Sequence, residues 1–360
     1  MTATLPTMKI AALAKQLSKD VHAVALPEGR KVGAPGHDKV RVYLGERLTA
    51  VGCMPFHGES FDLPYTHGGT HFTNVIGVTT GSNRALPALL IGAHYDSVIN
   101  SCCADDNAAA VAIALAVAQW AAGRLERDLV IALFDAEEPP YFSTSAMGSN
   151  RFYADQLGDR QIHAALVMDL VGHDVSITGR MLEQMGGNEG IEPRASHLPL
   201  PELLPLVFMT GAESHPELPG IVTSIGHPAG LKIMPLRNQC IGDMSDHGAF
   251  RVHGVPYVFL SCGHWQHYHR VTDTPDRLNY SKMAHITRYT AALVEKLDAA
   301  ALVRTWQVER TCDTLELERR MMQQALGDYF PLVLRAAGVA GIGTRADMER
   351  VVLLLLGLGL

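Results

Sequence analysis

The chain has no long run of lysine or arginine residues, and only 19% of its 360 residues are charged. It carries 30 basic and 37 acidic residues, which leaves a net charge of −7. A basic patch or stripe is the usual electrostatic signature of nucleic-acid binding, so nucleic acid is not an expected partner. The longest apolar run, Val351–Leu360, is glycine-interrupted and spans ten residues. A bilayer crossing needs about 20 apolar residues, so we also expect no membrane partner.

The first residues, Met1–Leu17, lack the charged and then apolar segments of a secretory signal. The six cysteines contain no CxxC pair, and Cys102 and Cys103 are adjacent, which disfavours a disulfide between them. These features are typical of reduced thiols in a cytoplasmic protein. We therefore expect a cytoplasmic location.

Apolar runs and helical patterns alternate along most of the chain. This alternation predicts an α/β fold in which a mostly parallel, mixed central sheet carries helices on both faces. The segments 74–78 and 88–93 are predicted to be neighbouring strands joined by the turn 80–83. Further strands are expected at 128–134, 162–168 and 255–261, and helices at 9–24, 38–51, 108–122, 145–156 and 281–302. No structure is assigned to the glycine- and proline-rich stretch up to residue 233.

The last sixty residues differ in character from the rest. Residues 302–325 are charged and show helical spacing, and a final helix is expected to begin after Thr344 as its N-cap. We therefore divide the chain into a catalytic domain, 1–300, and a helical C-terminal extension, 301–360. The extension is expected to pack on the core, with a subunit surface of a homo-oligomer or a flap over the substrate entrance as alternatives.

Histidine and carboxylate residues follow the ends of several predicted strands. The set consists of His94, Asp106, Glu137, Glu138, Asp169 and His269. Open α/β sheets place their sites at the carboxyl ends of the strands. A catalytic zinc commonly takes three ligands of these types and leaves a position open. Two zinc ions need five such ligands if one carboxylate bridges them, and the sixth residue would then be available as a base.

Each of these residues also has a structural interpretation. Glu137 and Glu138 would be a solvated loop in most proteins, and Asp106 and Asp169 would be helix caps. Asp96 lies two residues after His94 and therefore points the same way on an extended chain. This arrangement is typical of a carboxylate that orients a metal-binding imidazole.

Six short segments, in order and at similar spacing, resemble the co-catalytic di-zinc aminopeptidases. That family includes bacterial leucyl aminopeptidases and is related to glutamate carboxypeptidase II and the glutaminyl cyclases. The resemblance extends over roughly 31–297. The segments are Ala93–Ser97, Ala104–Asn107, Phe134–Glu138, Met168–Leu170, Ser245–His247 and Tyr268-His269 followed by Asp273-Thr274.

The resemblance implies a role for each matching position. His94 and Asp169 would hold one zinc ion, Glu138 and His269 would hold the other, and Asp106 would bridge them. Glu137 would be the general base and then the acid toward the leaving amine. Tyr268 matches a position at which some relatives place a hydrogen-bond donor to the tetrahedral oxyanion. Supporting positions near the metals are Asp96, Asp246 and Asp273, although Asp246 is also a candidate helix N-cap.

The resemblance implies an aminopeptidase that hydrolyses the N-terminal peptide bond with water activated between two zinc ions. The substrate would be a peptide or aminoacyl compound with a free amino terminus, and Co²⁺ or Mn²⁺ would also suit the ligands. The alternatives are a one-zinc glutaminyl cyclase or other small-amide hydrolase, an acylase or carboxypeptidase with an inserted lid domain, and a binding protein without catalytic metal.

Four details of the site stay open at this stage. His264 and His267 compete with His269 as the last ligand, although Asp273 stands at the family's offset from His269. Cys103 and Ala110 replace residues that tend to be glycine in the family. Asp243 occupies a position near the specificity pocket that is often small or apolar in relatives. We hypothesise that it favours a basic side chain or holds the substrate's amine.

Overall fold

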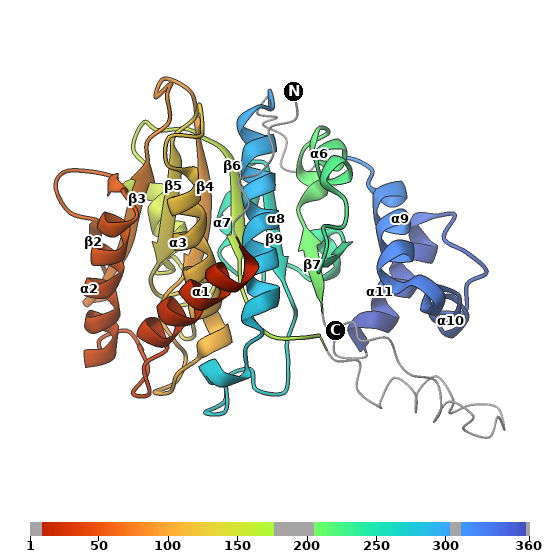
Figure 1. Ribbon diagram of the computed structural model, residues 1–360, viewed down its shortest axis with the longest axis horizontal. Coiled ribbons are helices and arrows are strands. Elements are labelled where there is room, and N and C mark those ends of the chain that lie inside the picture. The colour runs from red at the N-terminus through yellow and green to blue at the C-terminus, as the bar shows by residue number, and fades with distance from the viewer. Residues whose placement is uncertain (1–8, 176–204, 303–310, 358–360) are drawn as a thin grey trace.

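Nine strands form one mixed sheet in the computed structural model, which describes residues 9–175, 205–302 and 311–357 (Figure 1). The strand order is β1-β3-β5-β4-β6-β9-β7-β8, and β2 pairs with β3. The central strands β5, β4, β6 and β9 run parallel, whereas β3 and β7 run antiparallel to their neighbours β5 and β9. The strands are β1 Met54–Pro55, β2 Asp62–His67, β3 Thr70–Thr79, β4 Ala88–His94, β5 Leu129–Phe134, β6 Ile162–Met168, β7 Leu206–Thr210, β8 Lys232–Pro235 and β9 Tyr257–Ser261.

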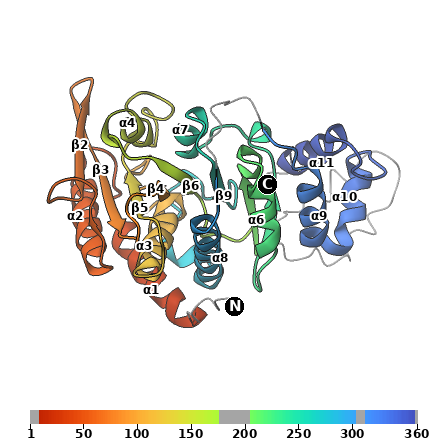
Figure 2. The ribbon, with the colours of Figure 1, turned by 90° about the horizontal axis from the view of Figure 1, so that it is seen from above.

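Helices cover both faces of this sheet, as predicted (Figure 2). One face packs against α1 Ile10–Val24, α2 Pro35–Ala50, α3 Ala109–Ala121, α6 Leu218–Ile225 and α8 Tyr280–Asp298. The other face packs against α4 Gly148–Arg151, the π-helical turn η2 Phe152–Gln156 and α7 His247–Val252. Helix α3 is buried at every position but one, because its residues are almost all alanine, valine, isoleucine and leucine. The predicted α/β class is confirmed.

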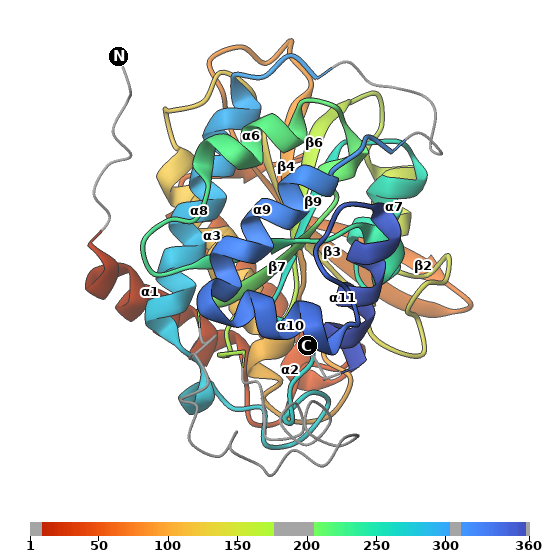
Figure 3. The same ribbon diagram turned by 90° about the vertical axis from the view of Figure 1, so that its right-hand side faces the viewer.

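The C-terminal helices extend the molecule beyond the β8 edge of the sheet. They are α9 Leu315–Leu326, α10 Phe330–Ala336 and α11 Arg345–Gly357, and they lie together on the side of the molecule that faces the viewer in Figure 3. Helix α9 packs against β8, and Leu317, Met321 and Val351 belong to the main apolar core. Covering an edge strand in this way removes exposed backbone groups that would pair with another chain.

The predicted cap of the last helix is confirmed. The Thr344 hydroxyl accepts a hydrogen bond from the Asp347 amide at 3.3 Å, and the Asp347 carboxylate accepts one from the Thr344 amide at 2.9 Å. This reciprocal pattern satisfies two amides at the start of α11. Part of the predicted helical stretch 302–325, residues 303–310, lies outside the described residues, and α9 begins only at Leu315.

Two local predictions are wrong. The strands β3 and β4 are not neighbours, because β5 lies between them. The turn after β3 pairs instead with the chain that leads into β5: the Ser82 and Asn83 amides donate to the Leu125 and Glu126 carbonyls. Residues 145–156 do not form one helix either, since α4 has four residues and continues as the π-helical turn η2.

Smaller differences concern ends and omissions. Helix α2 starts three residues earlier than predicted, because Pro35 suits the first helical position. The strands β1, β2, β7 and β8 and the short helices α6, α7 and α10 were not predicted. The 3₁₀ turns are η4 Ala212–Ser214, η5 Asn238–Cys240, η6 Pro275–Arg277 and η7 Gly327–Tyr329. Within the described ranges, no helix combines the length and apolarity that a bilayer crossing requires.

A buried ion pair joins α9 to α11 and generates a stability prediction. Both Glu318 oxygens accept from the Arg345 guanidinium, at 2.7 and 2.8 Å, and Glu318 is 1% exposed. We expect Glu318→Gln to lower the free energy of unfolding by about 2–3 kcal/mol in urea titrations. Breaking a fully buried ion pair would cost more free energy of unfolding. The loss is smaller here because Arg345 still has Asp313 as a partner.

Glu316→Gln is the matched control, because Glu316 lies on the same helix but forms an exposed pair with Arg319. Exposed pairs contribute little, so this variant should unfold like the wild type. Equal losses for both variants would contradict the role assigned to the Glu318–Arg345 pair.

Candidate functional site

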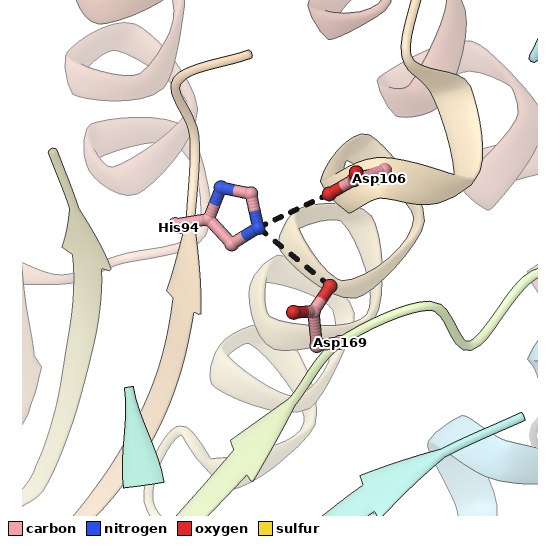
Figure 4. Close-up of side chains that lie close together, drawn as sticks. All are labelled: His94, Asp106 and Asp169. Carbon is pink, nitrogen blue, oxygen red and sulfur yellow. Dashed lines mark ion pairs between the residues drawn. The ribbon is translucent and has the colours of Figure 1, made fainter. Parts of the chain in front are cut away.

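The predicted metal ligands converge at the carboxyl ends of the parallel strands. His94 ends β4, Asp169 follows β6, and Asp106 lies on the π-helical turn η1 Ala104–Ala108 before α3. His94 Nε2 lies 3.3 Å from Asp106 Oδ1 and 3.6 Å from Asp169 Oδ1, as Figure 4 shows. These three side chains form one group able to hold a metal ion.

A second group shares Asp106 with the first. His269 Nε2 lies 3.2 Å from Asp106 Oδ2 and 3.3 Å from Glu138 Oε2. Glu138 follows β5, and His269 lies in the loop after β9. The two oxygens of Asp106 therefore face different histidines. This is the arrangement expected of a carboxylate between two metal ions.

Unpartnered buried atoms indicate that these residues suit metal ions. His94 Nε2, Asp106 Oδ2, Asp169 Oδ1 and His269 Nε2 make no well-formed hydrogen bond within the described residues, although all four are buried. Buried polar atoms almost always have partners. In each group the potential ligand atoms lie within 4.8 Å of one another. Mixed imidazole and carboxylate ligands suit zinc, with three protein ligands to each ion and a position left open.

The electrostatics of the cluster point in the same direction. Burial raises the pKa of Glu138 above its ordinary value, and the nearby Asp106 carboxylate adds to the increase. Burial likewise raises the pKa of Asp169, with the Asp106 carboxylate adding to the shift. Burial disfavours the charged form of His269, but Asp106 and Glu138 outweigh it and raise its pKa to about 10. The site thus holds more negative charge than it can ionise together, and bound cations would compensate it.

Glu137 lies beside this cluster without belonging to either metal-binding group. Its Oε2 is 3.8 Å from His94 Nε2, and the residue is 5% exposed. Burial raises its pKa well above the ordinary value, although His94 opposes the shift and Asp169 adds to it. A carboxylate with high proton affinity at the edge of a metal site is suited to take up a proton and return it.

Asp96 and Asp273 hold the backbone around the ligands. Asp96 accepts hydrogen bonds from the amides of Glu137 and Glu138, at 3.1 and 3.2 Å, and its Oδ1 lies 3.3 Å from His94 Nδ1. Asp273 accepts from the amides of Asp105 and Asp106 at 2.9–3.2 Å. Each of these carboxylates therefore orients backbone that carries candidate ligands, and Asp96 also lies beside the His94 ring.

Asp246 is buried in the same region. It directly precedes α7, but its side chain makes no capping hydrogen bond to that helix. Burial raises its pKa to about 7, with His94 opposing and Asp169 adding to the shift. Charged groups of the cluster therefore act on Asp246, and no capping bond to α7 explains its position.

The three histidines of the loop after β9 have different surroundings. Only His269 joins a metal-binding group. His267 bonds to the Thr272 hydroxyl at 2.8 Å. The exposed His264 stacks on Tyr268 at 4.2 Å between ring centroids, and Tyr268 stacks on His269 at 3.7 Å. The Tyr268 ring is therefore held beside His269, a candidate metal ligand. It lines a cavity that Asp169 also lines.

That cavity has a volume of about 330 Å³ and is mostly apolar. Its apolar lining comes from Leu170, Phe208, Leu236, Cys240, Ile241, Met244 and Phe259. Asp243 is not among the lining residues. Its carboxylate accepts two hydrogen bonds from Arg251, both 2.6 Å, and one from Asn238. The hypothesis that Asp243 receives a basic side chain or amine is therefore not supported, because Arg251 already neutralises it.

The two departures from the family pattern are accommodated. Ala110 is buried in α3, where alanine is the most favourable residue. Cys103 adopts φ +41°, a left-handed conformation that favours glycine. Burial raises the pKa of its thiol to about 12. The peptide bond between Asp106 and Asn107 is cis.

Two buried histidine–carboxylate pairs support the site and were not predicted. His37 Nε2 lies 2.8 Å from Asp135 Oδ1, directly before the Glu137 loop. His173 Nδ1 lies 2.6 Å from Asp105 Oδ2, next to Asp106. In the sequence, Asp135 and Asp105 each lie next to a segment that carries candidate ligands. This position was the signal that could have identified the two carboxylates as part of the site. Their histidine partners are far away in the sequence, 98 and 68 residues.

Known proteins match the sequence over more than half of its length. The sequence matches the model of Peptidase family M28 over residues 74–294. It is 26% identical to the uncharacterized protein YfbL of Escherichia coli strain K12 over 252 residues, which cover 63% of this chain and 71% of that protein.

Solved structures with the same fold include two aminopeptidases and a cyclase. The LapA aminopeptidase of Legionella pneumophila has a TM-score of 0.61 at 15% identity, covering 81% of this chain and 73% of that chain. A leucine aminopeptidase precursor from Bacteroides thetaiotaomicron has a TM-score of 0.57 at 15% identity, covering 81% and 98%. A glutaminyl cyclase from Porphyromonas gingivalis has a TM-score of 0.57 at 16% identity, covering 79% and 97%.

The predicted fold and the family resemblance are thus confirmed, the former by the solved structures and the latter by a match over more than half of the chain. The chain belongs to Peptidase family M28.

Proposed function

We propose that the protein is an aminopeptidase that uses two divalent cations, with zinc as the first candidate, to hydrolyse the N-terminal peptide bond of peptides. The observation that carries this proposal is the shared carboxylate of Asp106 between two groups of ligands. His94 and Asp169 would complete one site, and Glu138 and His269 would complete the other.

Bound cations would polarise the scissile carbonyl and increase the acidity of a water molecule. Glu137 is the residue proposed to remove the proton from that water. The same carboxyl group would then deliver the proton to the departing nitrogen, so that a new amino terminus is released. Its burial supports this double role, because a buried carboxyl group retains a proton more readily than an exposed one.

Tyr268 is proposed to donate its phenolic O–H to the oxygen that becomes negative during the reaction. The Tyr268 ring stacks on both His264 and His269, and these contacts restrict its movement. Little reorganisation would therefore be needed when the charge develops. The apolar cavity beside Asp169 would receive the side chain of the first substrate residue. The surplus of carboxylates nearby would attract its protonated amine.

A glutaminyl cyclase is the main alternative, because structures with this fold include cyclases. The family resemblance associates that reaction with a single zinc ion. Two complete groups of ligands with Asp106 in common favour two ions, and therefore favour hydrolysis.

The base assignment is tested with Glu137→Gln. This change keeps the size and polarity of the side chain but removes the proton acceptor, so kcat on a leucine anilide should fall by about 10²–10⁴-fold. Metal content and unfolding temperature should stay close to those of the wild type. Glu46→Gln, in an exposed position of α2, serves as the control and should retain full activity. Activity of Glu137→Gln within a few-fold of wild type would reject Glu137 as the base.

Metal removal tests the two-ion site. Dialysis against a chelator should abolish hydrolysis, and added zinc should restore it with about two ions per chain. Asp106→Asn should weaken both sites together, whereas Glu138→Gln should mainly weaken one. A stoichiometry of one ion, with cyclisation of glutaminyl peptides and no anilide hydrolysis, would instead favour the cyclase.

Substrate preference tests the cavity. Leucine, methionine and phenylalanine anilides should exceed lysine and arginine anilides by at least about tenfold in kcat/KM, because an apolar cavity does not compensate a buried charge. Asp243→Ala should leave this ratio unchanged, whereas Met244→Glu, on the cavity wall, should shift it toward lysine. A wild-type preference for lysine that Asp243→Ala abolishes would restore Asp243 as the specificity residue.

A further inference from the structure

Arg30 is a fully buried cation that forms no ion pair in the part of the chain that the structure describes. It lies in the loop between α1 and α2 and has 0% exposure. Within the described ranges, no carboxylate oxygen forms an ion pair with it. Burying a charge without a counter-ion is costly unless other dipoles replace the lost water. The environment of Arg30 must therefore supply those dipoles.

Four main-chain carbonyls surround the guanidinium. Its Nε donates to the Tyr95 carbonyl at 2.6 Å and its Nη1 to the Cys102 carbonyl at 2.6 Å. Its Nη2 donates to the carbonyls of Cys103 and Asp106, at 2.8 and 2.9 Å. Four of the five N–H groups of the arginine are thus used, in a planar fork that lysine does not possess.

These carbonyls belong to two segments that carry metal-binding side chains. Tyr95 follows His94 at the end of β4, and the other three carbonyls come from the loop that carries Asp106. Asp273 already holds the Asp106 amide at 3.2 Å, and Arg30 holds its carbonyl. The backbone of Asp106 is therefore anchored on both sides, while its carboxylate faces the two histidines.

The segment that carries Arg30 is itself closely packed on this region. The Arg30 amide donates to the Ser97 hydroxyl at 2.9 Å. Gly29 has φ +74°, and a Cβ at this position would come within 2.6–2.7 Å of backbone atoms of Asn100 and Ser101. Only glycine permits this approach, so the position of the guanidinium is defined by the backbone as well as by its own hydrogen bonds.

We propose that Arg30 is a positioning residue for the metal centre: its buried guanidinium fixes Asp106 relative to His94 through carbonyls on both segments. This inference rests on the proposed two-cation function. Because Asp106 belongs to both groups of ligands, Arg30 acts on both sites at once. Its positive charge alone would repel cations, so its contribution to metal binding is geometric.

Zinc titration of the apoprotein against a chromophoric chelator tests this inference. In Arg30→Lys the charge remains but the fork is lost, and we expect both zinc dissociation constants to rise by about 10–100-fold. In Arg30→Gln the charge is lost as well, which by electrostatics alone would tighten zinc binding. We nevertheless expect weaker binding, and tighter binding by Arg30→Gln would overturn the proposal.

Arg127→Lys is the matched control. Arg127 is also buried and donates to main-chain carbonyls, those of Asp298 and Pro87, but it precedes β5 at the opposite end of the strands. Its loss should lower the unfolding temperature of the apoprotein without changing zinc affinity by more than about twofold. If Arg30→Lys and Arg127→Lys bind zinc with the same affinities, Arg30 contributes only to stability and the positioning role is rejected.

Gly29→Ala provides the decision if the Arg30 variants do not fold. It retains the guanidinium but displaces the segment, and it should weaken both zinc sites; unchanged affinity would overturn the proposal. If the wild-type protein binds no zinc, the proposed metal centre itself is rejected. If the wild type binds two zinc ions and Arg30→Lys binds them with the same affinities, only the role of Arg30 is rejected.

Discussion

The carboxylate of Asp106, buried between two histidines, sets the conditions that the rest of the site must meet. Its oxygens lie 3.2–3.3 Å from His94 and His269, while Glu137, Glu138 and Asp169 are also buried nearby. Such a concentration of carboxylates in a medium of low dielectric constant is unfavourable without compensating positive charge. Cations are the compensation that the arrangement of ligand atoms favours, and the surrounding backbone must hold these side chains together before a cation binds.

The topology of the sheet brings most of these side chains together. Because β5, β4, β6 and β9 are parallel and adjacent, their carboxyl ends lie at one edge and deliver Glu137, His94, Asp169 and His269 to the same place. Asp106 arrives separately, from the turn before α3. Two of these segments are then anchored by buried carboxylates: the Glu137 loop by Asp96, and the Asp106 loop by Asp273. The site is therefore supported mainly through main-chain hydrogen bonds, which tolerate little displacement.

The cavity next to the candidate metal site is built differently. The cavity beside Asp169 is lined by apolar residues from β7, β9 and the segment 236–244. That segment is connected to the C-terminal helices, since Gln239 on η5 bonds to Glu349 on α11 at 3.2 Å. Asn238, in turn, bonds to Asp243 and His247, which do not line the cavity themselves. The C-terminal helices thus lie behind the wall of the cavity, whereas the candidate metal ligands come from the end of β4, from segments that follow β5, β6 and β9, and from the turn η1.

The sequence by itself determined the family and the candidate ligands, because six local segments, each with its own histidine or acid, stand in an order that resembles one family. It also determined the buried strands and α3, because a run such as 129–134 or 109–121 is apolar at almost every position, and the Thr344 cap, because capping depends on neighbours three residues apart. Only the tertiary structure decided that β5 separates β3 from β4, that Asp243 is neutralised by Arg251, and that His37 and His173 support the acidic loops. Arg30 belongs to the same class, since a single arginine in a loop carries no local sign of burial. These interactions join residues from 8 to 98 positions apart, and their energies depend on burial and on backbone dipoles that no local pattern contains.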